Sequence, residues 1–224
     1  MSRSNATAPC TPIRWHGSNS LSASRQDASG ATDVATHPGC GRASRLVRTG
    51  CAATYAEGAE QAGHAVHQID LAALDFPILR TMQEYEHGAI PDSLKDAPDA
   101  IVRAEHIVFV FPLWQGTMPA LLKAFLEQVM RPGTAFAYPD KGGGFPKALL
   151  RGRSARLVVT MGMPSIFYRL WFLSHGIAGM RRSILRFAGI RPVRETLFGM
   201  VAGASDATRA KWLGHLRRLG GRAL

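Results

Sequence analysis

The feature of this sequence that most constrains its fold is an unbroken apolar run, Ile107–Phe111, which a helical pattern follows. The run holds only β-branched and aromatic residues. It is too short for a free-standing helix, and it lacks the polar alternation of a strand with one face in water. It therefore predicts a strand buried on both faces, as in a parallel sheet.

A helix is expected shortly after this strand. Pro112 ends the strand, Thr117 can cap a helix, and Pro119 is tolerated in a first helical turn. The helical pattern ends at Arg131–Gly133. Its apolar positions, which recur at helical spacing, are Leu121, Leu122, Phe125, Leu126 and Val129.

The loop between this strand and helix, Pro112–Gly116, is the first candidate for a binding site. In an open parallel sheet, ligands bind beyond the carboxyl ends of the strands. The loop contains apolar side chains, the planar ring of Trp114 and the glycine Gly116. This combination suits a flat aromatic cofactor.

The rest of the chain predicts an alternation of helices and strands that is typical of a doubly wound α/β fold. The first expected elements are a helix capped by Ser44, interrupted at Gly50 and closed by Gly63, a strand at 64–71, a loop at 74–91 and a weak helix at 92–104. After the central strand and helix, we expect a fourth strand at 155–160, helical or irregular segments at 165–188 broken at Gly176 and Gly179, a fifth strand at 193–201 and a helix capped by Ser205.

The first 43 residues differ from the rest because they are rich in small and polar residues. We expect segment 1–43 to be disordered or poorly ordered, since it cannot bury enough apolar surface, and residues 44–224 to form the folded domain. The first strand of the sheet could lie at 12–16 or at 32–38. Neither has the apolar run of a central strand.

The net charge of the chain does not by itself identify a class of partner. A formal charge of +11 attracts nucleic acid, anionic lipid and phosphorylated small molecules alike. The basic residues are scattered, so a solvated basic surface and a dedicated polyanion site both remain open. They are densest at Arg181, Arg182, Arg186, Arg191 and Arg194.

Composition also excludes several classes of protein. No apolar run approaches the ~20 residues that span a bilayer, and the N-terminus lacks the apolar core of a secretory signal, so we expect a cytoplasmic protein without stable membrane insertion. The three cysteines, Cys10, Cys40 and Cys51, have no metal-ligand spacing and are expected to be free thiols. We expect no metal site.

Three short motifs in order, "FPLW" from Phe111, "MPALLK" from Met118 and "FAY" from Phe136, resemble the flavodoxin-like NAD(P)H:quinone oxidoreductases, including the oxidoreductases ancillary to potassium efflux systems. The similarity continues through Leu157–Arg169 and Arg181–Gly199. The resemblance implies a flavodoxin-like, doubly wound parallel sheet of five strands in the order 2-1-3-4-5, here with the first strand degenerate or missing.

The resemblance also implies the chemistry. A member of this family passes hydride from NAD(P)H through bound FMN or FAD to a quinone or a similar electrophile, and it works as a homodimer. Two loops would hold the flavin, with Thr160 and Gly162 presenting backbone groups to its pyrimidine edge. The flavin-binding residues implied are Phe111, Pro112, Leu113, Trp114, Thr160, Met161 and Gly162.

Four further residues have roles that the resemblance implies. Tyr168 and His175 would handle the charge and protons of the reduced flavin, although His175 lies one residue later than the family spacing. Phe136 and Tyr138 would wall the substrate side, and core packing explains them nearly as well. The apolar cluster of Met161, Met163, Phe167, Trp171 and Phe172 is either core or dimer interface, or a roof over a quinone.

Two functions of other classes stay open. In the resembled family, the loop after the first strand holds the flavin phosphate, and the candidates for it here, 17–20 and 39–44, follow weak strands. Such an altered loop is compatible with a regulatory or ancillary subunit that has little or no turnover. A basic polyanion binder is the third possibility, but the sequence has no nucleic-acid motif and no aromatic residues interleaved with the basic ones, so no nucleic-acid partner is expected.

Overall fold

The structure, a computed structural model, describes residues 42–139 and 144–223, with only the backbone of residues 42–49. All described residues belong to one compact unit, Ala31–Leu224. Both candidate first strands lie outside the described residues, and so does the segment 1–43 that was expected to be disordered, except for Arg42 and Ala43, whose backbone is helical.

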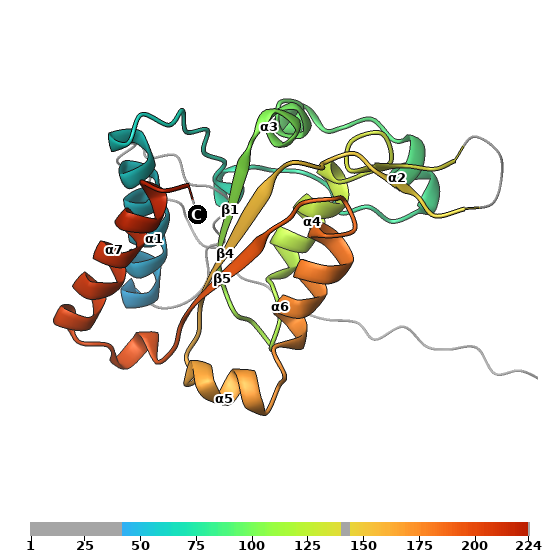
Figure 1. The fold of residues 1–224 in the computed structure, drawn as a ribbon. Coiled ribbons are helices and arrows are strands. Elements are labelled where there is room, and N and C mark those ends of the chain that lie inside the picture. Colours follow the sequence, from blue (N-terminus) through green and yellow to red (C-terminus); the bar gives the residue numbers. More distant parts are fainter. Residues whose placement is uncertain (1–41, 140–143, 224) are drawn as a thin grey trace, which may run out of the picture. The chain divides into compact units, whose positions relative to one another are not determined.

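A parallel sheet forms the centre of this unit (Figure 1). Its strands are β1 (His106–Pro112), β4 (Ser154–Thr160) and β5 (Val193–Phe198), in the order β1-β4-β5. In β1 and in β4, six of the seven residues are buried. The expectation of a strand buried on both faces is therefore confirmed.

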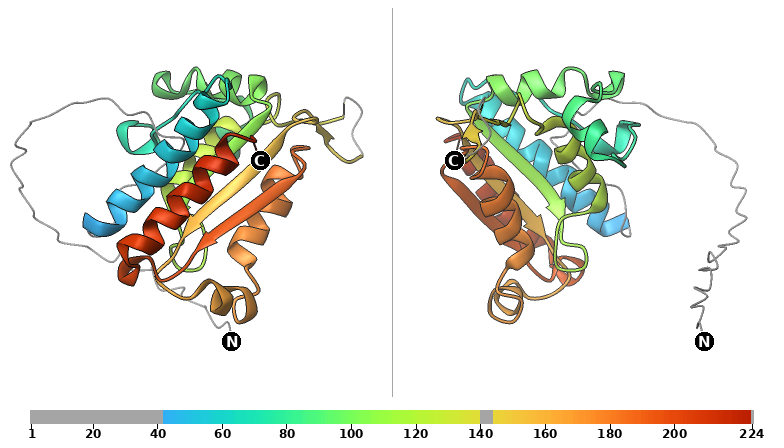
Figure 2. Two further views of the ribbon diagram at one scale, coloured as in Figure 1. Left: turned by 60° about the vertical axis from the view of Figure 1, so that its left-hand side comes forward. Right: turned by 90° about the vertical axis from the view of Figure 1, so that its right-hand side faces the viewer.

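Two long helices cover one face of the sheet. These are α1 (Arg42–Gln61) and α7 (Asp206–Gly220), which lie side by side in front of the strands in the left view of Figure 2. Val110 and Val158 pack toward them beside Cys51, whose thiol is free and whose pKa burial raises to about 12. Ser205 caps α7 as expected, accepting a hydrogen bond from the Thr208 N–H at 3.3 Å.

The opposite face is covered by α4 (Ala120–Val129), α6 (His175–Gly179) and the π-helix η3 (Met180–Leu185) (Figure 1). Apolar side chains that alternate with Val110 and Val158 along the strands fill this side. The buried contacts include Phe109, Phe111, Leu157 and Val159 from the strands and Leu122, Phe125, Ile177 and Met180 from the helices.

Short elements connect these parts. They are η1 (Leu71–Ala73), α2 (Met82–His87), η2 (Asp92–Leu94), α3 (Ala97–Arg103), β2 (Phe136–Ala137), β3 (Lys147–Ala148), α5 (Ser165–Leu170) and η4 (Val201–Gly203). The predicted elements at 92–104, 155–160 and 193–201 are thus present, and the fifth strand ends three residues early. The broken helices expected at 165–188 are α5, α6 and η3, but the breaks are not at Gly176 and Gly179: α6 contains Gly176 and continues directly into η3, and the interruption lies at 171–174.

Several local predictions are wrong. Residues 64–70 are not a strand. The described part of the chain contains three parallel strands, so the order of five strands with a degenerate first strand is not confirmed. A strand needs a hydrogen-bonding neighbour, and no described strand lies on the free edge of β1. Helix α1 runs unbroken through Gly50 and includes Ser44, which was expected to cap it.

No helix in the described ranges is long and apolar enough to cross a membrane. The same residues hold no cluster of three or more histidine, cysteine or acidic side chains that could bind a metal ion.

Candidate functional site

The loops that follow β1, β4 and β5 meet at the carboxyl ends of the strands. The Leu113 N–H donates to the carbonyl of Thr160 at 2.7 Å, which joins the first two loops. The Met161 N–H donates to the carbonyl of Phe198 at 2.8 Å, which joins the second to the third. The sequence predicted the first two loops, and main-chain hydrogen bonds hold them side by side.

The first loop is a tight turn. Trp114 and Thr117 exchange two main-chain hydrogen bonds, both 2.9 Å long. Gln115 and Gly116 between them have φ angles of +46° and +79°. Two central residues with positive φ are the mark of a type I′ turn, which glycine favours at its second position. Thr117 therefore closes this turn, and the expectation that it caps the following helix is wrong, because α4 begins at Ala120.

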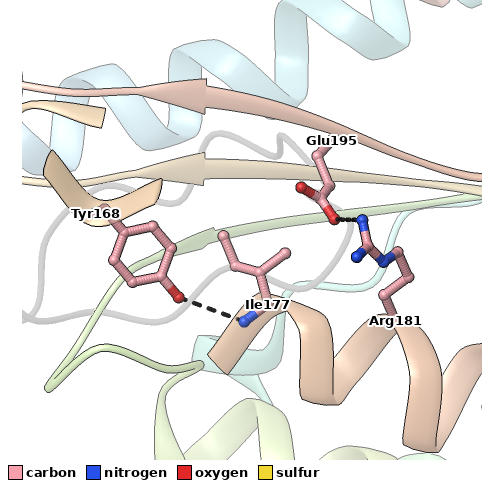
Figure 3. Close-up of polar contacts among 4 residues, drawn as sticks. All are labelled: Tyr168, Ile177, Arg181 and Glu195. Atoms are coloured by element: carbon pink, nitrogen blue, oxygen red, sulfur yellow. Dashed lines mark hydrogen bonds and ion pairs between the residues drawn. The ribbon is translucent and has the colours of Figure 1, made fainter. Parts of the chain in front are cut away.

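Tyr168 on α5 anchors this turn. Its hydroxyl donates to the carbonyl of Gly116 at 2.9 Å and accepts from the Ile177 N–H at 3.4 Å (Figure 3). The residue has no exposed surface, and burial raises the pKa of its phenol. Tyr168 thus ties the turn to the start of α6.

Gly176 in α6 packs directly against the same turn. A Cβ atom at this position would lie 2.1 Å from the Gly116 carbonyl oxygen and 2.6 Å from the Cα of Thr117. Only glycine allows so close an approach. One turn further on, Arg181 pairs with Glu195 of β5 at 2.6 Å (Figure 3), so the helix that supports the turn is itself held to the sheet.

The second loop leaves space and hydrogen-bond donors free. Gly162 is exposed, and a Cβ atom there would meet nothing within 4 Å. Among the described residues, the N–H groups of Gly162, Gln115 and Gly116 donate no hydrogen bond. The two loops therefore present unpaired backbone donors, and the first loop also carries the half-buried ring of Trp114.

The seven predicted cofactor residues divide into two groups. Leu113, Trp114 and Gly162 are half-buried or exposed. The others are buried within the fold, where they shape the loops: Phe111, Pro112, Thr160 and Met161. Both backbone groups of Met161 are already used, since its carbonyl accepts from the Val201 N–H at 3.2 Å.

Of the four residues expected to contact protons or substrate, only two lie at these loops. Tyr168 is enclosed, and His175 is exposed at the first position of α6, beside Gly176. Phe136 and Tyr138 lie elsewhere, because β2 pairs with β3, which precedes β4. The seven residues of β4 span roughly 20 Å, so the structure does not bring this aromatic pair to the loops.

Sequence reasoning missed the third loop. Met200 adopts a φ of +55°, and its N–H donates to the carbonyl of Met163 at 3.2 Å. A Cβ atom on Gly199 would lie 2.6 Å from the backbone nitrogen of Ser165, so this loop supports the second one closely. The rule that ligands bind beyond the carboxyl ends of strands would have pointed to it.

The chemistry of the first two loops suits a flat, polar-edged aromatic group. They carry a tryptophan ring, a glycine beside open space and three unpaired N–H donors, and none of their residues from Leu113 to Thr117 and from Met161 to Pro164 is charged. Backbone donors of this kind stabilise negative charge without reorganising. The donor set fits an isoalloxazine ring.

The chain is also similar to known proteins. A family model described as "Flavodoxin-like fold" matches residues 44–219. An uncharacterized NAD(P)H oxidoreductase of Haemophilus influenzae is 29% identical over 144 residues, which cover 62% of this chain and 70% of the relative. The FMN-dependent NADH:quinone oxidoreductase 2 of Listeria innocua is 36% identical over 136 residues, covering 56% of this chain and 63% of that protein.

A solved structure is also similar. The NAD(P)H:quinone oxidoreductase from Methanothermobacter marburgensis superposes with a TM-score of 0.67 at 22% identity, covering 86% of this chain and 97% of that one. At this identity the likeness shows the fold alone.

Proposed function

The chain belongs to the family described as the flavodoxin-like fold, and from that premise we propose that it is a flavin-dependent NAD(P)H oxidoreductase that reduces a quinone or a similar electrophile. The observation that supports this proposal most is the hydrogen bond from Leu113 to Thr160, 2.7 Å long, which keeps the two loops together. The printed names of the relatives support the same class of reaction.

Each element of the site has a distinct task in this proposal. Trp114 would hold the flavin ring by aromatic contact, and the N–H of Gly162 would donate a hydrogen bond to it. When bound, the flavin supplies the redox chemistry by accepting hydride from NAD(P)H and giving electrons to the acceptor. The backbone dipoles at Gly162 favour negative charge on the ring, and thereby its reduced state.

The two titratable side chains have different tasks. His175 is exposed beside the turn, so it can exchange a proton with the reduced acceptor or with solvent. Tyr168 is enclosed, with both hydrogen-bonding roles of its hydroxyl occupied by the chain. We therefore assign Tyr168 to positioning the turn.

FMN is the flavin that we propose, and NADH the reductant, because relatives are named FMN-dependent NADH:quinone oxidoreductases. FMN has a phosphate that needs an anchor, and helix N-termini are natural phosphate sites. The candidate phosphate loop at 17–20 lies outside the described residues, and of the one at 39–44 only residues 42–44 are described, as the first residues of α1. Titration with FMN and FAD in parallel distinguishes the two, and tighter binding of FAD would refute the assignment.

The first experiment is the colour and turnover of the purified full chain. We expect visible flavin absorbance, or quenching of FMN fluorescence on titration, together with oxidation of NADH that depends on an added quinone. A colourless protein that refuses FMN and oxidises no NADH would favour an ancillary, non-catalytic subunit instead.

The second experiment tests the position of the ring. Trp114→Ala removes a half-buried aromatic contact, so we expect FMN affinity to fall about tenfold, that is by ~1.4 kcal/mol. Ile78→Ala removes an exposed apolar side chain from another part of the fold and should leave FMN affinity unchanged. Equal affinity in Trp114→Ala and the parent protein would refute this position.

We also propose that two copies associate through α5 and the turn that follows it. Large apolar side chains are exposed there, and such patches mark interaction surfaces. The residues are Ile166, Leu170, Trp171 and Leu173, each more than half exposed. Light scattering should give twice the mass of one chain, and Trp171→Asp should give single chains, whereas Ile78→Asp should not.

A further inference from the structure

A hollow at the opposite end of the sheet has four arginines in its lining. Its volume is about 460 Å³. Arg151 precedes β4 and Arg191 precedes β5, so the hollow lies where these strands begin, a strand length from the loops of the flavin site. Arg182 belongs to η3, and Arg186 follows directly after it.

These four arginines have no acidic partner within 42–139 and 144–223. Among the described residues none of them forms an ion pair, and no carboxylate lines the hollow. The same fold neutralises other arginines: Arg181 pairs with Glu195 at 2.6 Å and Arg217 pairs with Glu57 at 2.7 Å. Four unpaired cations around one concave surface concentrate positive potential there.

The negative end of a helix explains at most part of this arrangement. Arg186 follows the last turn of η3, where a cation is favoured by the helix dipole. Arg151 and Arg191 come from the loops before two strands and have no such reason to lie beside it. An anion bound in the hollow would relieve the repulsion among all of them.

Aromatic rings complete the lining. Phe145 is 90% exposed, and Phe187 is partly exposed at 36%. The ring of Phe187 packs edge-on against Phe136, with centroids 5.1 Å apart, which holds it in place. One arginine guanidinium can bind two phosphate oxygens at once. Exposed aromatic rings stack on flat heterocycles. A volume of about 460 Å³ suits one small molecule.

We propose that this hollow binds a phosphorylated small molecule with a flat aromatic part, of which a mononucleotide is the simplest representative. The site is separate from the flavin site and does not depend on the proposed reaction. A nucleic-acid strand fits the surface less well, because the arginines converge on one hollow and do not follow an extended stripe.

The test is calorimetric titration of the purified full chain with ATP, with and without added FMN, at constant ionic strength. We expect ATP to bind in both conditions, inorganic triphosphate to bind more weakly because it lacks the ring, and adenosine not to bind because it lacks the phosphates. No binding of ATP would overturn the proposal. So would loss of ATP binding when NADH is added, because that would assign ATP to the co-substrate site.

Paired variants locate the site. Arg186→Ala with Arg191→Ala should weaken ATP binding about tenfold or more and leave FMN binding intact. Arg80→Ala with Arg218→Ala removes the same charge from exposed positions elsewhere and should have no effect. Equal loss in both pairs would mean that only net charge matters, which would overturn the proposal. If a single-stranded oligonucleotide bound the hollow more tightly than ATP, the ligand would be nucleic acid, and the small-molecule proposal would be wrong.

Discussion

The hydroxyl of Tyr168 donates a hydrogen bond to the carbonyl oxygen of Gly116, 2.9 Å away, across 52 positions of sequence. This bond joins the turn after β1 to the helix after β4. The turn carries Trp114, and the start of α6 carries His175, so one buried phenol sets the geometry of both.

Tyr168→Phe should therefore lower stability and flavin affinity together. The substitution leaves the Gly116 carbonyl and the Ile177 N–H without their shared partner, which costs about 1–2 kcal/mol in the free energy of unfolding. Denaturant titration and FMN titration measure the two effects. Tyr138→Phe, at a half-exposed position, should change neither.

The pH dependence of turnover distinguishes positioning from proton transfer by Tyr168. A positioning residue changes FMN affinity and leaves the shape of the profile unchanged. If Tyr168→Phe abolished a limb of the profile while FMN affinity and stability stayed at the parent values, a direct proton role would replace our assignment.

Gly176→Ala should disturb the turn from the other side. The new methyl group would lie 2.1 Å from the Gly116 carbonyl oxygen, and main-chain atoms cannot move aside cheaply. We expect a loss of about 1–3 kcal/mol in the free energy of unfolding and weaker FMN binding.

Gly179→Ala is the matched control in the same helix. A Cβ atom at this position would meet nothing within 4 Å, so alanine should stabilise the helix by about 0.5–1 kcal/mol. Similar losses for both glycines in urea titrations would contradict the packing argument.

Acid should destabilise the protein through His106. Its ring nitrogens contact the Tyr55 hydroxyl at 3.0 Å and the Ser154 hydroxyl at 2.7 Å, and burial, with Arg156 and Arg194 nearby, lowers its pKa to about 4 from 6.5. Between these values the unfolded chain binds more protons than the folded chain. The free energy of unfolding therefore falls as pH drops from 6.5 to about 4 and levels off below.

Urea midpoints measured at several pH values test this contribution. His106→Gln removes the titrating group, so the difference between the midpoints at pH 7 and at about pH 4 should be smaller than in the parent protein. His87→Gln alters an exposed histidine and should leave the difference between the two urea midpoints as it is in the parent protein. If His106→Gln left the difference between the midpoints unchanged, other groups would be the cause of the acid sensitivity.

Cys51 should be inert toward thiol reagents in the folded protein. Its side chain is fully buried and its thiol pKa is raised to about 12, so little thiolate forms near neutral pH. In a chain with Cys10→Ser and Cys40→Ser, the reaction should proceed at the rate of unfolding. Fast modification under native conditions would contradict the burial.

The elements that could be predicted from sequence are those whose signal is local. The apolar run at β1 and the serine before α7 carry information within a few residues, and both predictions are confirmed. The strand expected at 64–71 failed for a different reason. Its alternating pattern is local, but a strand exists only with a hydrogen-bonded neighbour, and none lies beside it in the described part of the chain.

The sequence by itself determined which loops follow the buried strands, because a short apolar run and the residues that end it are neighbours in the chain. Only the tertiary structure decided what those loops do. The bonds from Leu113 to Thr160 and from Tyr168 to Gly116 join residues about fifty positions apart. Their formation depends on how the strands and helices pack, and no local pattern records that Tyr168 faces inward while His175 faces solvent.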